Sequence, residues 1–263
     1  MGLDAHCHLQ FAAFDDDREE ALGAARAAGV RGVILADYDE ERRGLSVELA
    51  SSTEGVWACC GLHPWAVADR DDDELEASLQ AVKEALGEHP FCAVGELGMD
   101  YYRAKGEEER ARQERAFVRQ LGWARELNLP VVIHAVRCHN SLVKVLRREG
   151  VPEAGGILHG YSGSPRQVGT FLMMNLDLSV GTPLVWGDQR ARESVKQCPL
   201  DRLLVETDAP DRPADRSRGR NEVKYLGEVI DAVASIRGEP AQKVREATEE
   251  NARRRFALGD GTL

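Results

Sequence analysis

Histidine and carboxylate residues stand at the ends of several short apolar runs in this sequence, and both residue types bind divalent cations. His6 and His8 are two residues apart, so on a β-strand both imidazoles would project from one face and reach the same ion. The further candidate ligands are Glu96, His134, His159 and Asp208. Six candidate ligands exceed the usual need of one catalytic ion, and a carboxylate can bridge two, so the set indicates a two-metal site.

Eight apolar runs supply the elements that would bring these residues together. They cover residues 2–8, 32–36, 56–61, 91–96, 131–134, 156–159, 176–180 and 203–206. Runs that are apolar throughout, instead of alternating with polar residues, are typical of strands buried on both faces of a parallel sheet. Each candidate ligand would then stand at the carboxyl end of a strand, where barrel enzymes carry their active sites. His63 has the same placement after the third run.

Helical patterns alternate with most of these runs. They cover residues 17–28, 72–86, 107–127, 140–149, 165–174, 188–197, 221–237 and 240–256. The alternation predicts an α/β protein with one (β/α)8 TIM barrel domain over residues 1–263. An open doubly wound sheet is the alternative fold, and it is disfavoured because no glycine-rich phosphate-binding turn follows the first run.

The charge balance bears on the substrate. The chain has 34 basic and 45 acidic residues, a net charge of −11, which argues against broad affinity for nucleic acid. A local cluster after the eighth run nevertheless contains Arg212, Arg216, Arg218 and Arg220, and Arg137 follows the fifth run. Guanidinium groups suit phosphate oxygens, so this rim could bind a phosphate. The alternative is that the arginines only pair with neighbouring carboxylates of the same loop.

Localisation is predicted from the absence of targeting signals. The sequence has no apolar run long enough to span a membrane and no secretory leader pattern at its start, which favours the cytoplasm. None of the six cysteines forms a C-x-x-C pair, so we expect them to be reduced and mostly buried.

Several motifs resemble those of the TatD family of metal-dependent deoxyribonucleases, which belongs to the amidohydrolase-like barrels. They are DAHCHL at 4–9, GLHP at 61–64, GELGMDY at 95–101, LPVVIH at 129–134, HGYSG at 159–163, LVETDAP at 204–210 and RNE at 220–222. The motifs extend over nearly the whole chain, and together they are highly specific. The departures from the family pattern are Ala5, residues 135–138, Gly160 and residues 211–212, and we expect them to alter the pocket wall while sparing the ligands.

The resemblance implies a hydrolase with two divalent cations, for which Mg²⁺, Mn²⁺ and Zn²⁺ are the candidates. The first ion would be held by His6, His8, Glu96 and Asp208, and the second by Glu96, His134 and His159. Glu96 would therefore be the bridge. The catalytic residues would be Asp208, as proton acceptor from the attacking water, together with Glu96 and His63. The candidate substrate-binding residues are His63, Arg137, Arg212 and Arg220.

The implied substrate is single-stranded DNA, degraded by cleavage of phosphodiester bonds in the 3′–5′ direction, with no membrane and no obligate protein partner. Two other functions stay open. An amidohydrolase acting on an amide, lactone or ester would be marked by a carbamylated lysine at the fourth strand, where this chain has Glu96. An accessory subunit without nuclease turnover would be expected to lack a ligand, and none is missing.

Overall fold

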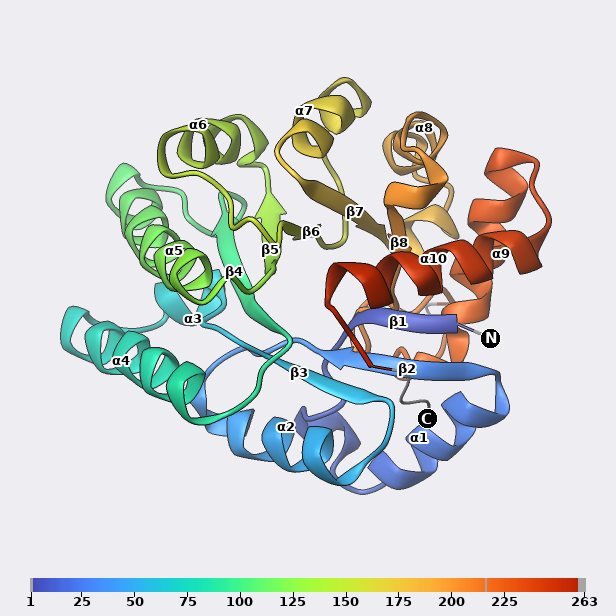
Figure 1. The fold of residues 1–263 in the computed structure, drawn as a ribbon, viewed down its shortest axis with the longest axis horizontal. Helices are drawn as coiled ribbons and strands as arrows, with labels where there is room; N and C mark the ends of the chain where they lie inside the picture. Colours follow the sequence, from blue (N-terminus) through green and yellow to red (C-terminus); the bar gives the residue numbers. More distant parts are fainter. Residues whose placement is uncertain (1, 216, 260–263) are drawn as a thin grey trace.

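Eight parallel strands form a ring in the computed structural model, which describes residues 2–215 and 217–259. The strands are β1 (Gly2–Cys7), β2 (Val30–Leu35), β3 (Val56–Cys60), β4 (Ala93–Asp100), β5 (Val131–Val136), β6 (Gly156–Leu158), β7 (Leu176–Val180) and β8 (Leu203–Val205). They follow one another around the ring in sequence order, with helices outside (Figure 1). This arrangement confirms the predicted (β/α)8 barrel.

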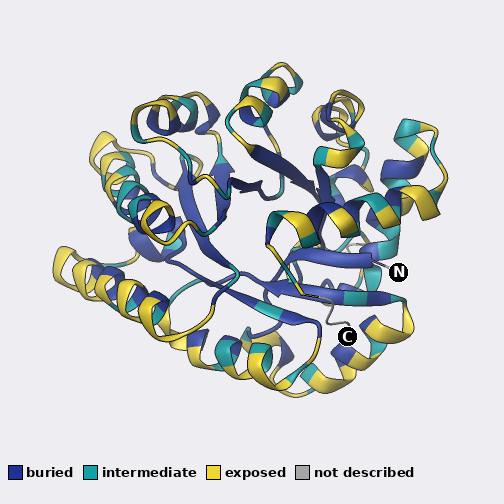
Figure 2. Ribbon diagram, viewed as in Figure 1, coloured by how far each residue is buried: buried dark blue, intermediate teal, exposed yellow. Residues whose placement is uncertain are grey.

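The helices shield the strands from solvent on the outside of the ring. They are α1 (Arg18–Ala27), α2 (Glu40–Ser52), α3 (Pro64–Ala68), α4 (Asp72–Glu88), α5 (Glu107–Leu127), α6 (His139–Glu149), α7 (Val168–Met173), α8 (Gln189–Gln197), α9 (Leu226–Arg237) and α10 (Ala241–Arg255). Their outer faces are exposed while the strands are buried, as the apolar runs predict (Figure 2). Within residues 2–215 and 217–259, no helix is long and apolar enough to cross a membrane.

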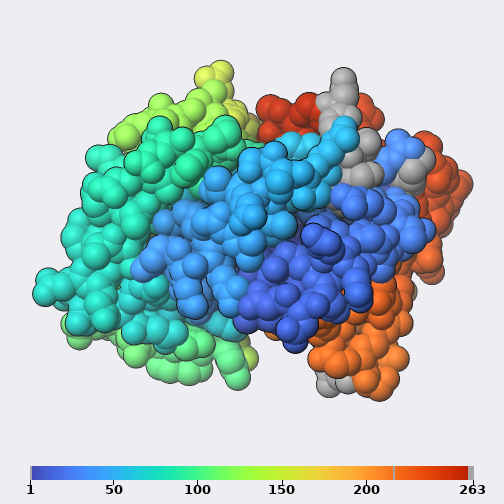
Figure 3. Space-filling model, turned by 90° about the horizontal axis from the view of Figure 1, so that it is seen from below, coloured from blue at the N-terminus to red at the C-terminus, as the bar shows by residue number. Residues whose placement is uncertain are grey.

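The ring closes where β1 meets the segment after β8. The amide of His8 donates to the carbonyl of Ala209 at 2.7 Å, and the amide of Asp208 donates to the carbonyl of His6 at 3.0 Å. The buried carboxylate of Asp4 accepts from the amide of Thr207 at 3.0 Å and from its hydroxyl. The closure therefore places the two histidines of β1 beside Asp208. The chain after β8, orange in the space-filling view, projects from the lower edge of the molecule (Figure 3).

Two helices were absent from the sequence-based prediction, the five-residue α3 and the longer α2. α2 lies between β2 and β3, and its buried residues are Arg43 and Ser46 instead of an apolar stripe. Arg43 donates to the buried carboxylate of Asp37 at 2.7 Å, so an ion pair takes the place of apolar packing. The apolar periodicity that indicates a helix is consequently missing. The helix predicted over residues 221–237 is also shorter in the structure, because α9 begins only at Leu226.

Two strands continue further than predicted. β4 runs to Asp100, so Glu96 lies in its middle instead of at its end, and β5 runs past His134 to Val136. Gly98 permits the close approach of these two strands, because a Cβ at this position would overlap the backbone of His134. Its φ of 138° is also one that residues with side chains rarely adopt. Glu96 and Asp100 therefore both stand beside His134.

Candidate metal centre

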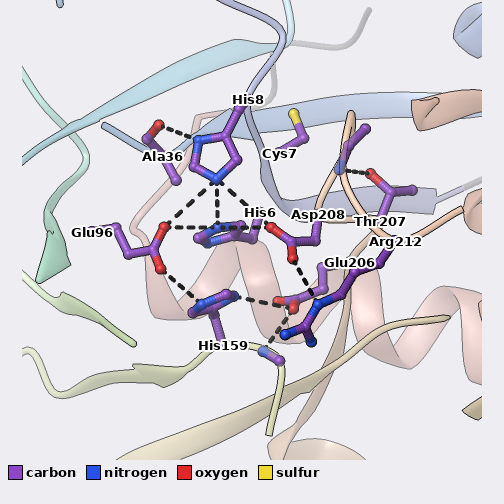
Figure 4. Close-up of polar contacts among 12 residues, drawn as sticks. His6, Cys7, His8, Ala36, Glu96, His159, Glu206, Thr207, Asp208 and Arg212 are labelled. Carbon is purple, nitrogen blue, oxygen red and sulfur yellow. Dashed lines mark hydrogen bonds and ion pairs between the residues drawn. The ribbon is translucent and has the colours of Figure 1, made fainter. Parts of the chain in front are cut away.

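One carboxylate oxygen of Glu96 faces the histidines of β1. Its Oε2 lies 3.2 Å from Nε2 of His6 and 3.6 Å from Nε2 of His8, and the two nitrogens are 3.3 Å apart. The Oδ1 of Asp208 lies 3.6 Å and 3.7 Å from the same nitrogens. Figure 4 shows these groups converging from β1, β4 and the segment after β8. They form the first cluster: His6, His8, Glu96 and Asp208.

The other oxygen of Glu96 faces a different group of histidines. Its Oε1 lies 2.7 Å from Nδ1 of His134 and 2.8 Å from Nε2 of His159, and these nitrogens are 3.2 Å apart. Glu96, His134 and His159 form the second cluster. The two clusters share only Glu96, which is 1 % exposed. The geometry thus brings together all six residues that were predicted as ligands.

The outer ring nitrogens of three histidines contact acceptors. Nδ1 of His8 lies 3.0 Å from the carbonyl of Ala36, Nε2 of His134 lies 3.3 Å from Asp100, and Nδ1 of His159 lies 3.3 Å from Glu206. A proton on each outer nitrogen satisfies these contacts and leaves a lone pair on the inner nitrogen, directed at Glu96. Inner lone pairs facing a carboxylate repel it unless a positive charge lies between them. The donor set therefore fits divalent cations.

In the metal-free centre, protons take the place of the cations: burial opposes charge on both rings, but Asp100 and Glu96 raise the pKa of His134, and Glu96 and Glu206 raise the pKa of His159 well above its ordinary value. Burial alone would raise the pKa of Glu96, but His159, His63 and His6 around it hold that pKa well below its ordinary value. Burial also lowers the pKa of His8, to about 3, so its imidazole is neutral and able to bind a metal. The pKa of Asp208 is raised, chiefly by burial. Asp208 adopts a φ of 58°, which aspartate tolerates better than most residues.

His63 approaches the second cluster but differs from its members. Its Nε2 lies 3.2 Å from Oε1 of Glu96, while its Nδ1 accepts a hydrogen bond from the amide of Trp65 at 3.1 Å. The neutral ring must then carry its proton on Nε2, and burial lowers the pKa of His63 to about 4, which keeps it neutral. The nitrogen that faces the centre is thus a donor, which suits contact with substrate better than metal binding.

Both clusters lie at the bottom of a pocket of about 260 Å³. Five of the residues in its wall stand where the sequence departs from the family pattern: Ala135, Val136, Gly160, Asp211 and Arg212. These five departures therefore lie in the pocket wall as expected, whereas Ala5 is buried in the core and does not line the pocket.

The predicted substrate-binding arginines lie in different surroundings. Arg212 lines the pocket, with its Nε 4.0 Å from Oδ2 of Asp208, and Arg137 lies over the ring of Tyr102 beside it. Arg220 instead pairs with Asp17 and stacks on Phe14, so it holds the β8–α9 segment against the start of α1. Arg218 pairs with Glu228 at 2.8 Å, and Arg216 lies outside the described residues. Arg218 and Arg220 therefore pair with carboxylates, as in the alternative interpretation, and do not form a phosphate-binding rim.

Three buried carboxylates near the centre were not predicted. Asp100 accepts from the indole of Trp65 at 2.6 Å and contacts His134; Glu206 contacts His159 and accepts from the amide of Gly160 at 2.6 Å. Asp4 holds the segment that carries Asp208. The sequence contained a signal for Asp100, because Glu96 and Asp100 are four positions apart and so can share a face of β4. Glu206 lies beyond the end of β8, where strand periodicity gives no such signal.

A barrel with paired histidine and carboxylate clusters at the carboxyl ends of its strands defines a metal-dependent hydrolase. The family model of the TatD related DNases matches residues 3–257, and the chain therefore belongs to the TatD family. The metal-dependent hydrolase YabD of Bacillus subtilis is 31% identical over 260 residues, which cover 98% of this chain and 100% of that protein.

Two further comparisons agree. The 3′-5′ ssDNA/RNA exonuclease TatD of Klebsiella pneumoniae is 32% identical over 270 residues, covering 97% of this chain and 98% of that protein. The crystal structure of the TatD homologue YjjV from Escherichia coli superposes with a TM-score of 0.87 at 31% identity, and covers 98% of each chain.

Proposed function

We propose that this protein is a two-metal phosphodiesterase that degrades single-stranded DNA from the 3′ end. The observation that carries the proposal is the placement of Glu96, whose two oxygens face two separate clusters at the bottom of one pocket. The name of the Klebsiella pneumoniae relative, a 3′-5′ exonuclease for single-stranded DNA and RNA, supports the choice of substrate and direction.

His6, His8, Glu96 and Asp208 would hold one cation, and Glu96, His134 and His159 the other. Two divalent cations held by these residues would lower the pKa of water and would neutralise the charge that develops on a phosphate. The two carboxylates suit Mg²⁺ and Mn²⁺, whereas the four imidazoles suit Zn²⁺, so the test includes all three ions.

The chain's own residues supply the proton transfers. Asp208 accepts a proton from the attacking water, and burial favours this role because it raises the pKa of Asp208 toward neutrality. His63 donates its Nε2 proton in a hydrogen bond to the phosphate or the leaving oxygen. Arg212, at the mouth of the pocket, binds a non-bridging phosphate oxygen.

The test compares substrates of different chemistry. The purified protein, reconstituted with Mg²⁺, Mn²⁺ or Zn²⁺, is incubated with end-labelled single-stranded DNA, with RNA and with a panel of small carboxylic esters and lactones. We expect shortening of the DNA from its 3′ end, and we expect the same preparation of His134→Ala to lose at least about a hundredfold in rate, because one metal ligand is gone. Ester cleavage without phosphodiester cleavage would favour an amidohydrolase. If no substrate is cleaved, an accessory role without turnover would be favoured.

A further inference from the structure

A second pocket adjoins the catalytic pocket. Its volume is about 540 Å³, and it shares the wall residues Val136, Ser162 and Arg212 with the catalytic pocket. The two pockets therefore meet at these three residues, so a strand with one phosphodiester in the catalytic pocket would reach the second pocket by passing over them.

The second pocket has a cationic wall. Arg137, Arg190 and Arg212 all line it. In the described part of the chain, Arg137 and Arg190 form no ion pair with a carboxylate, whereas Arg218 and Arg220 of the neighbouring loop are both paired. The one acidic residue in the wall, Asp188, uses its carboxylate to cap α8 through the amide of Ala191 at 2.9 Å. Two guanidinium groups thus remain available to an anion.

The same pocket also offers an aromatic surface. Trp186 is 39 % exposed, and its indole nitrogen donates to the carbonyl of Ala214 at 3.0 Å, which fixes the position of the ring. An exposed ring held in place suits stacking on a nucleobase of any sequence.

His139 gives the pocket wall an unpaired polar atom. The residue is 9 % exposed, and within residues 2–215 and 217–259 its Nε2 has no hydrogen-bond partner. Its ring packs edge-on against Tyr161, and any side chain at Gly163 would collide with both rings. Gly163 therefore leaves room for the rings of His139 and Tyr161, both of which line the second pocket.

We propose that the second pocket binds the nucleotide next to the one whose phosphodiester is cleaved. Arg137 and Arg190 bind its phosphate, and Trp186 stacks on its base. The inference rests on the proposed phosphodiesterase function and deepens it, because it makes the substrate a strand that extends beyond a single phosphodiester.

The test uses the two shortest substrates that separate the pockets. The dinucleotide dTpdT has one phosphate, whereas dTpdTpdT places a second phosphate and base beyond the catalytic pocket. We expect kcat/KM of the metal-loaded wild type to be about tenfold or more higher for the trinucleotide, as one charge-assisted phosphate contact would give. In Arg190→Ala this ratio should fall by several-fold, because only Arg137 then binds the second phosphate, and in Trp186→Ala it should also fall by several-fold, with recovery in Trp186→Phe.

Arg192→Ala is the matched control, because it removes the same charge from α8 at a residue outside the pocket wall. It should keep the wild-type ratio. If the wild type cleaves both substrates equally well, or if Arg190→Ala keeps the full ratio, the second pocket does not bind the adjoining nucleotide and the proposed function still holds. A wild type that cleaves neither substrate overturns the proposed function, and this inference with it.

Discussion

At the scale of single residues, carboxylates that contact the outer nitrogens of the ligand histidines determine how these rings are oriented. Asp100 and Glu206 contact His134 and His159 from outside the second cluster and orient their lone pairs toward Glu96. Burial alone would raise the pKa of Asp100, but hydrogen bonds from His134 and Trp65 outweigh burial and hold that pKa below its ordinary value. Asp100 is thus a charged acceptor, which makes it a positioning residue for His134.

Asp100→Asn tests this role. The amide is nearly isosteric but is a weaker acceptor, so we expect affinity for one of two cations to fall about 10- to 100-fold, as measured by calorimetric titration with Mn²⁺. The surface variant Glu76→Gln, which removes an exposed carboxylate paired with Arg119, should bind both ions normally. If Asp100→Asn binds both Mn²⁺ ions with wild-type affinity, the contact between Asp100 and His134 has no influence on metal affinity.

At the scale of elements, the position of β4 against β5 depends on a missing side chain. Gly98 has a φ of 138°, and a Cβ there would overlap the backbone of β5 at His134. The strand that carries Glu96 can therefore approach the strand that carries His134 only if this residue is glycine.

Gly98→Ala should lower the free energy of unfolding in urea by about 3 kcal/mol or more, because the strands must separate and the backbone is strained. Gly122→Ala is the matched control. Gly122 lies inside α5, and a Cβ there would meet nothing within 4 Å. That change should stabilise the protein by up to about 1 kcal/mol through helix propensity. Equal effects of the two variants would exclude a special role for Gly98.

The elements also show how far the sequence can predict this molecule. The strands were found because they are apolar on both faces, and the ligands were found because they end or follow such runs. α2 was missed because its fully buried positions are the polar residues Arg43 and Ser46, while its apolar residues are only partly buried, and this arrangement leaves no clear apolar period. Asp100 was missed because the apolar run was ended at Glu96, four residues before β4 ends. The pairing of Arg220 with Asp17 depends on the closed ring, which no local pattern reveals.

At the scale of the whole molecule, buried histidines make stability depend on pH. Burial lowers the pKa of His8 to about 3 and the pKa values of His63 and His139 to about 4. At these three positions the unfolded chain therefore takes up more protons than the folded one as the pH falls from about 6.5 to 4, so each of the three histidines lowers the stability of the metal-free protein over that range. Asp4 and Asp37 act in the opposite sense, because burial raises the pKa of each to about 7.

His139→Asn isolates one contribution, since His139 lies outside both metal clusters. We expect the loss of unfolding free energy between pH 6.5 and pH 4, measured by urea denaturation of the metal-free protein, to be smaller than in wild type by about 2 to 3 kcal/mol. His89→Asn, at an exposed histidine, should show the wild-type loss. If His139→Asn loses as much unfolding free energy between pH 6.5 and pH 4 as the wild type does, then burial does not lower the pKa of His139.

The bridging role of Glu96 is tested most directly by counting metal ions. Metal-free protein is equilibrated with Mn²⁺, freed of unbound ions, and measured by inductively coupled plasma mass spectrometry. We predict about two ions per wild-type chain and about two in His63→Asn, in which no ligand is lost. Glu96→Ala should retain fewer than one, because both clusters lose their shared carboxylate. Two ions in Glu96→Ala, or only one in the wild type, would contradict the two-metal centre.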